Sequence, residues 1–135
     1  MPQGSDLSIL IAEDSREMTR IVRSLLGRLG FSDIDEVPDG TAALTKLKKR
    51  RYDLLISDIH MEPMDGLELA SKVRGDEELG AVRVIIMSGS GEQAKVLRAK
   101  EIGVDGYLLK PFSIAPLKRV VGGVLRQNDI RAEAA

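Results

Sequence analysis

The sequence predicts an α/β fold in which a doubly wound sheet of five parallel strands carries helices on both faces. One reason is that five short apolar segments alternate with segments whose apolar residues recur at helical spacing, as in parallel sheets joined by right-handed crossovers. The other is that the first, third and fourth apolar segments are unbroken runs, as expected for strands covered on both faces. The second segment is polar, which favours an edge position and the strand order 2-1-3-4-5.

The expected strands are short segments bounded by polar residues or turn signals. They span residues 7–12, 33–37, 53–57, 81–88 and 104–109. In this order the connections reverse direction beside the first strand, as they do in flavodoxin-like folds. The predicted topology is therefore flavodoxin-like.

The first helix is the best defined, because six apolar residues after the first strand share one helical face. They are Met18, Ile21, Val22, Leu25, Leu26 and Leu29. Asp14 or Ser15 can cap its start, and Gly30 can end it. Weaker helical patterns follow the other strands, over residues 43–47, 66–74, 91–102 and from 113 onward.

Length and composition indicate one domain over residues 7–126, with a disordered lead at 1–6 and a solvated tail at 127–135. The net charge of -1 and an aromatic content of 3% argue against a nucleic-acid partner. The basic run at 48–51 is more typical of a solvated helix end. No cysteine, signal peptide or membrane span is found, so we expect a cytoplasmic protein with no membrane partner.

Polar side chains stand at the carboxyl ends of four expected strands, where the functional crevice of an open parallel sheet lies. These residues are Glu13 and Asp14 after the first strand, Asp58 at the end of the third, Ser88 at the end of the fourth and Lys110 after the fifth. The strand order makes these four strands neighbours. Three carboxylates, one hydroxyl and one ammonium group are therefore expected to face one crevice.

Carboxylates this close repel one another, by roughly 4 kcal/mol for a pair at about 4 Å and an effective dielectric near 20. Lys110 can compensate one charge, and Mg²⁺ held by one or two carboxylates can compensate the others. Asp58 is central, and a carboxylate in that position can act as a nucleophile toward a phosphoryl group. The irregular loop after Asp58 can add a further metal ligand, for which the backbone carbonyl of His60 is the candidate.

The pattern resembles the receiver domain of two-component response regulators over about residues 7–126. The motifs that carry the resemblance are Glu13-Asp14, Asp58 with Met61, Met64, Asp65 and Gly66, then Ser88, Tyr107 and Lys110-Pro111-Phe112. No output domain follows the fifth helix in this sequence. The chain is therefore similar to stand-alone regulators of the chemotaxis type.

The resemblance implies a phosphoacceptor site. Glu13 and Asp14 would hold Mg²⁺ together with Asp58. Asp58 would accept a phosphoryl group from a phosphohistidine on a sensor histidine kinase or a histidine phosphotransferase. Lys110 would contact the phosphate, and a cis Lys110–Pro111 bond would direct its ammonium group into the crevice.

The resemblance also implies a switch. Ser88 would turn toward the phosphoryl group, Tyr107 would turn inward, and the face of the fourth helix, fifth strand and fifth helix would change for an output protein of unknown identity. The chain would be a bacterial signalling module and not an enzyme, with only weak self-dephosphorylation.

The sequence departs from the family pattern at several positions. Pro63 stands one residue later than the usual loop proline, Ser88 replaces the commoner threonine, and Gly89 replaces the usual alanine. His60 and Ser90 occupy the two positions that tune the lifetime of the phosphoryl group in this family. We expect that pair to set the lifetime here.

Other functions fit the sequence less well. A Mg²⁺-dependent phosphatase that forms an aspartyl phosphate would need a second acid two residues after Asp58, where His60 stands. A flavin carrier would place its phosphate against carboxylates, and a pure binding scaffold would not need an intact acid, hydroxyl and lysine set. Residues 89–94 fit G-x-G-x-x-A, but this segment follows the fourth strand, so a dinucleotide site is not expected.

Overall fold

The computed structural model describes residues 6–89 and 93–134, which form one sheet of five strands in the order β2-β1-β3-β4-β5. The strands are β1 (Ser8–Ala12), β2 (Asp33–Val37), β3 (Leu54–Asp58), β4 (Arg83–Ser88) and β5 (Gly106–Leu109). Every neighbouring pair is parallel. The predicted fold class and strand order are confirmed, with the polar β2 at one edge.

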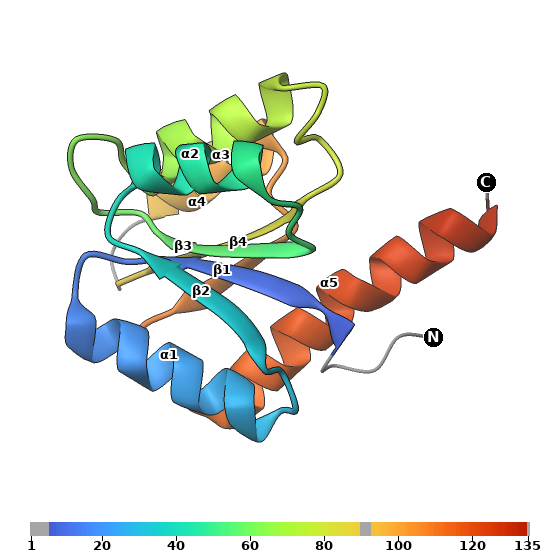
Figure 1. Ribbon diagram of the computed structural model, residues 1–135, viewed down its shortest axis with the longest axis horizontal. Coiled ribbons are helices and arrows are strands. Elements are labelled where there is room, and N and C mark those ends of the chain that lie inside the picture. Colours follow the sequence, from blue (N-terminus) through green and yellow to red (C-terminus); the bar gives the residue numbers. More distant parts are fainter. Residues whose placement is uncertain (1–5, 90–92, 135) are drawn as a thin grey trace.

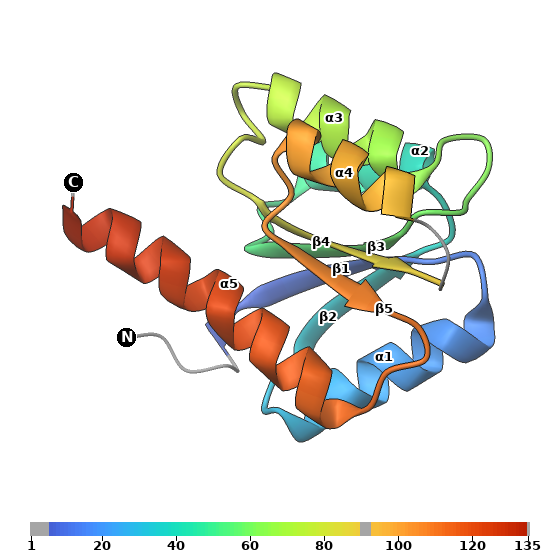
Figure 2. The same cartoon turned by 180° about the vertical axis from the view of Figure 1, so that it is seen from behind.

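The helices form a layer on each face of the sheet. One face carries α1 (Arg16–Arg28) and α5 (Ile114–Ala134), and the other carries α2 (Gly40–Lys49), α3 (Gly66–Gly75) and α4 (Gln93–Ile102), as Figure 1 and Figure 2 show. The C-terminal part of α5 extends beyond the sheet (Figure 1). Among the described residues, no helix combines the length and apolar character needed to cross a bilayer.

Side chains that alternate along each strand divide the core into two layers. On β1, Leu10 and Ala12 pack with residues of α2 and α3, whereas Ile9 and Ile11 pack with residues of α1 and α5. All four side chains are fully buried, and β3 and β4 alternate in the same way. Burial on both faces is the reason that these strands appear in the sequence as unbroken apolar runs.

Capping side chains fix where three helices begin at the carboxyl end of the sheet. Ser15, Asp39 and Asp65 each accept a hydrogen bond from the backbone N–H group three residues later. At the other end of α1, Gly30 has a φ of 100°, which suits glycine best. The predicted limits of the first helix are therefore confirmed, with Ser15 as the cap.

Two strands begin two residues later than predicted, because residues near their expected starts bond to the preceding segment, whereas β1 and β3 begin only one residue later. The N–H group of Val82 donates to the turn before β4, so that strand starts at Arg83. The N–H group of Val104 donates to a carbonyl of α4, so β5 starts at Gly106. These backbone groups complete turns and do not join the sheet.

Several predictions concern residues outside the described ranges. The predicted lead falls almost entirely at residues 1–5, and Ser90 and the expected start of the fourth helix at 91–92 also lie outside. The backbone of the predicted tail continues α5 as far as Ala134. The domain limits themselves stay predictions.

Candidate functional site

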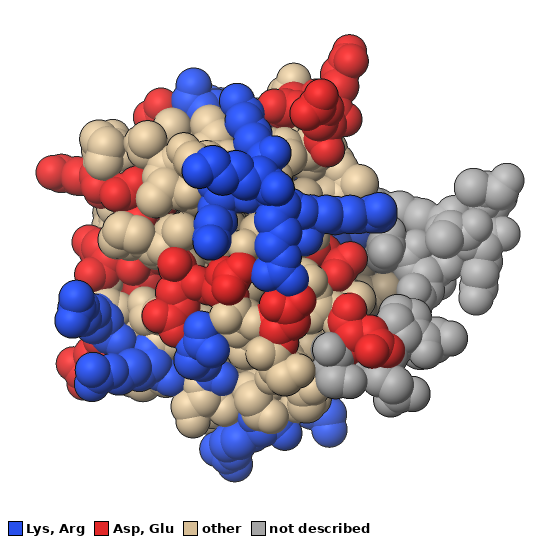
Figure 3. Space-filling model, viewed as in Figure 1, with Lys and Arg blue, Asp and Glu red and all other residues tan. Residues whose placement is uncertain are grey.

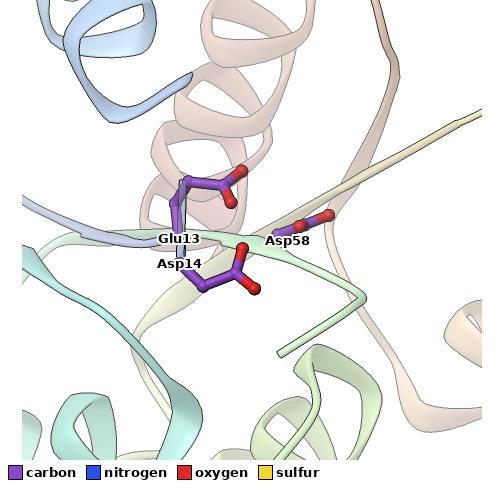
Figure 4. A group of neighbouring side chains, drawn as sticks. All are labelled: Glu13, Asp14 and Asp58. Atoms are coloured by element: carbon purple, nitrogen blue, oxygen red, sulfur yellow. The ribbon is translucent and has the colours of Figure 1, made fainter. Parts of the chain in front are cut away.

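Three carboxylates meet at the carboxyl end of the sheet. Glu13 and Asp14 follow β1, and Asp58 is the last residue of β3, which pairs with β1 (Figure 4). One carboxylate oxygen from each residue lies within 4.8 Å of the others. Glu13 and Asp58 are only 3% and 5% exposed, whereas Asp14 is exposed. The group is therefore buried on one side and open to solvent on the other.

Glu13 is held in place by two hydrogen bonds. Its carboxylate accepts from the backbone N–H group of Ser15 at 3.0 Å and from the Lys110 ammonium group at 3.1 Å. Burial, with smaller contributions from the carboxyl groups of Asp14 and Asp58, raises the pKa of Glu13 to about 7 against the effect of these two donors. A bound cation would relieve this cost of ionisation.

Lys110 provides the positive charge of the site. Its Nζ atom lies 3.1 Å from Oε1 of Glu13 and 3.1 Å from Oδ1 of Asp58. Burial acts to lower the pKa of Lys110, but the two carboxylates outweigh it and hold the pKa above its usual value. The Lys110–Pro111 bond is cis, as the resemblance implied.

The loop after Asp58 folds back tightly onto the end of β3, and two glycines permit this. A Cβ atom on Gly66 would lie 2.0 Å from the carbonyl oxygen of Asp58, and one on Gly40 would lie 2.7 Å from that of Met64. The N–H groups of both glycines donate to loop carbonyls, at 2.8 Å to Ile59 and 3.2 Å to Met64. The starts of α2 and α3 thus fix the loop beside the carboxylates.

Ser88 and Tyr107 form a second group beside the carboxylates. Ser88 ends β4, is fully buried, and has its hydroxyl group hydrogen-bonded to that of Tyr107 on β5. The Ser88 hydroxyl group also contacts the carbonyl oxygen of Gly89 at 3.3 Å. Tyr107 is half-buried against the core layer that α2 and α3 cover. The pair therefore connects the end of a central strand to an edge strand.

His60 lies on the exposed side of the site. Its Nε2 atom is 3.4 Å from Nζ of Lys95 on α4. His60, Met61 and Asp65 line, with Asp14, a hollow of about 410 Å³ beside the carboxylates. This hollow leaves room for a ligand, and the role of the His60 carbonyl as a metal ligand stays a prediction.

The donor set fits a magnesium ion. All three side chains offer carboxylate oxygens, which Mg²⁺ prefers to nitrogen or sulfur. Because one oxygen of each carboxylate lies within 4.8 Å of the others, the three side chains would hold a single cation between them. Solvent exposure on the Asp14 side would let the ion keep waters.

The predicted site residues thus fall into two groups, and their roles stay predictions. One group holds the charges of Glu13, Asp14, Asp58 and Lys110. The other is the hydroxyl pair of Ser88 and Tyr107.

Sequence reasoning missed Lys95, because nothing in the sequence connects α4 to the loop after Asp58. It also missed the contact of Gly40 with that loop, because this contact depends on tertiary structure.

Comparison with known proteins identifies the family. Residues 9–122 match the response regulator receiver domain. The chain is also 39% identical over 115 residues to the chemotaxis protein CheY-3 of Vibrio cholerae. This match covers 85% of this chain and 88% of that protein. This protein therefore belongs to the response regulator receiver domain family, whose members are signalling modules of two-component systems.

Solved structures agree with this assignment. The receiver domain of a signal transduction histidine kinase from Syntrophus aciditrophicus is 30% identical, with a TM-score of 0.82 over 90% of this chain and 91% of that one. The receiver domain of the sensor histidine kinase PA1611 from Pseudomonas aeruginosa is 26% identical, with a TM-score of 0.77 over 87% and 97%. That domain holds a magnesium ion in its active site cleft.

Proposed function

We propose that this protein is a response regulator in which Asp58 accepts a phosphoryl group from a phosphohistidine. The donor would be a sensor histidine kinase or a histidine phosphotransferase of a phosphorelay. The observation that supports this most is that Asp58 lies at the open end of the sheet, 3.1 Å from the Lys110 ammonium group and grouped with two further carboxylates. Lys110 offsets the charge of the nucleophile, and the exposed Asp14 leaves a path for the donor.

The proposed transfer balances without a further reactant. An oxygen of Asp58 bonds to phosphorus while the P–N bond of the donor breaks, and the electron pair of that bond returns to the imidazole nitrogen. Lys110 would contact the phosphoryl oxygens, and Ser88 would donate a hydrogen bond to them. Glu13, Asp14 and Asp58 would hold Mg²⁺, which when bound offsets the charge on the transferred group.

The proposed response passes from Ser88 to Tyr107. If the Ser88 hydroxyl group donates to a phosphoryl oxygen, its present geometry with Tyr107 must change, and we expect the tyrosine to turn inward. The face of α4, β5 and α5 would then change for an output protein. Leu97 and Leu109 lie on these elements and are 61% and 57% exposed, so that face already offers apolar side chains.

Intact-mass measurement tests the phosphoacceptor. The protein is exposed to a small acyl phosphate with Mg²⁺, and separately to a phosphorylated histidine phosphotransferase domain. We expect one added phosphoryl group, its absence in Asp58→Asn, and its slow loss after the donor is removed. The exposed Glu77→Gln is a control for general loss of negative charge.

Two outcomes would overturn the proposal. One is a result that excludes Asp58 as the acceptor: either the native protein stays unmodified with both donors, or the Asp58→Asn variant is modified as fully as the native chain. The other is repeated turnover of a phosphate ester, which would instead favour the Mg²⁺-dependent phosphatase.

A further inference from the structure

A second concave site lies at the amino ends of the strands, opposite the carboxylates. A cavity of about 490 Å³ is bordered by the end of α2, the segment before β4, and residues next to β1 and β3. Its apolar lining consists of Leu7, Leu47, Tyr52, Leu79, Ala81, Val82 and Leu125. Small-molecule sites typically enclose roughly 300–1,000 Å³ and are lined mainly by apolar groups. The size of the cavity lies in this range, and its lining is half apolar and half charged, which suits a small ligand with both an apolar and a charged part.

The rim of this cavity is basic. It carries the cations Lys48, Lys49, Arg50, Arg51 and Arg83 and the carboxylates Asp53 and Glu78. Figure 3 shows lysine and arginine side chains gathered on the side of the molecule where α2 ends. The rim thus has more positive than negative side chains.

Part of this rim is already engaged within the protein. Arg50 forms ion pairs with Asp33 and Asp35, and the Asp53 carboxylate accepts a hydrogen bond from the N–H group of Ser8 at 2.9 Å. The other four cations form no ion pair within the ranges that the structure describes. An excess of uncompensated positive charge therefore remains at the cavity.

Arg83 indicates more directly that something binds here. Of the buried side-chain nitrogen and oxygen atoms in the described part of the chain, only Nε of Arg83 has no hydrogen-bond partner. The backbone of Arg83 is fixed, because its N–H group donates to the carbonyl of Asp53 at 3.1 Å. Buried donors in native proteins are nearly always satisfied. The guanidinium group of Arg83 lines the cavity and forms no ion pair with a described residue, and such a group is suited to bind a carboxylate or a phosphate.

We propose that this cavity binds a small organic anion that carries a carboxylate or phosphate group on an apolar body. The charged group would pair with Arg83 and the rim lysines, and the apolar body would lie against the half-buried Leu7 and Leu125. The basic rim alone would suit any polyanion, but a site for a polyanion would not need an apolar cavity. The combination of a basic rim with an apolar lining is what favours a small amphiphilic anion. The proposal goes beyond the phosphoacceptor function and does not depend on it, since the two sites lie at opposite ends of the sheet.

An NMR titration of the full chain without Mg²⁺ or phosphodonor tests this proposal. The probes are hexyl phosphate, hexanoate, inorganic phosphate and hexanol. We expect saturable shifts at Leu47, Leu79 and Val82 with the first two probes, and affinities at least about tenfold weaker for the last two. The difference between hexyl phosphate and hexanoate shows which charged group is preferred.

Three variants locate the binding. We expect Arg83→Gln to weaken binding of hexyl phosphate by about tenfold. Ala81→Glu is a second variant that keeps the core intact, because residue 81 is exposed and lines the cavity, and it should weaken binding at least as much. Lys118→Gln, at an exposed position of α5 away from the cavity, should bind as the native chain does.

The proposal is overturned if no probe shifts these residues, or if hexanol or inorganic phosphate binds as tightly as hexyl phosphate. It is also overturned if neither Arg83→Gln nor Ala81→Glu, each folded by the criterion of its NMR spectrum, weakens binding.

Discussion

The Nζ atom of Lys110 lies 3.1 Å from Oδ1 of Asp58, and this contact joins an edge strand to the centre of the sheet. The same Nζ atom reaches Glu13, so one cation is shared by two buried carboxylates. Partly buried charges that compensate one another become costly when one of them is removed. Lys110 therefore stabilises the two buried carboxylates, and in the proposed function the same ammonium group would contact the phosphoryl group on Asp58.

Replacing Lys110 should slow phosphorylation without abolishing the fold. We expect Lys110→Met to lower the initial rate of Asp58 phosphorylation by an acyl phosphate by about 100-fold, because a donor aimed at the transferred group is lost. Lys110→Arg should retain part of the rate. The measurement is a time course of intact mass, with the exposed Lys118→Met as the control. A native rate in Lys110→Met would show that this ammonium group does not take part.

Magnesium should stabilise the folded protein through the three carboxylates. At a concentration about 100 times its Kd, a ligand of the native state adds about 2.7 kcal/mol to the free energy of unfolding. We expect the unfolding temperature to rise with Mg²⁺ and to fall again with a chelator. Asp14→Asn should reduce the rise while folding normally, since Asp14 is exposed. An equal rise in Asp14→Asn would mean that the ion binds elsewhere.

Gly66 should tolerate no side chain. Since a Cβ atom there would lie 2.0 Å from the carbonyl oxygen of Asp58, Gly66→Ala must move backbone, and we expect it to lower the free energy of unfolding by about 3 kcal/mol or more. Gly75→Ala in the same helix is the matched control. It meets no atom within 4 Å and should be neutral or stabilising by up to about 1 kcal/mol. Urea unfolding measures both, and similar losses in the two variants would contradict the tight packing of this loop.

The sequence was sufficient to predict the fold and to predict which charged residues lie together at the end of the sheet. Both predictions depend on where the apolar runs end. Burial on both faces makes the runs unbroken, and parallel strands bring their carboxyl ends together at one edge. The bond between Ser88 and Tyr107 could be suggested only by family resemblance, since it depends on side-chain rotation. The partly buried ion pair of Arg74 with Asp105 was not predicted at all, because it joins α3 to the residue before β5 through tertiary packing.

Removing the Tyr107 hydroxyl group should separate phosphorylation from its response. We expect Tyr107→Phe to accept a phosphoryl group at a rate within about twofold of the native rate, a difference of only about 0.4 kcal/mol in the barrier. The amide shifts that phosphorylation causes at Leu97 and Leu109 should become smaller, because Ser88 no longer has a hydroxyl partner on β5. NMR spectra with and without acyl phosphate measure both. Undiminished shifts in Tyr107→Phe would exclude the hydroxyl pair as the connection.

The phenol of Tyr52 gives a prediction for alkaline pH. Its hydroxyl group donates to the Asp35 carboxylate, and burial, with this bond, raises the pKa of Tyr52 to about 12 against the opposing effect of Arg50. An unfolded tyrosine ionises near pH 10, so the fold favours the neutral phenol. Its contribution to stability should be complete below about pH 10 and should be lost as the pH rises from about 10 to about 12.

Absorbance of the phenolate measures this ionisation in Tyr107→Phe, which leaves Tyr52 as the single tyrosine. The phenolate should appear near pH 12, and Asp35→Asn in the same background should shift its appearance toward pH 10. Circular dichroism at each pH confirms that the chain is still folded, and ionisation near pH 10 in the folded Tyr107→Phe protein would refute the prediction.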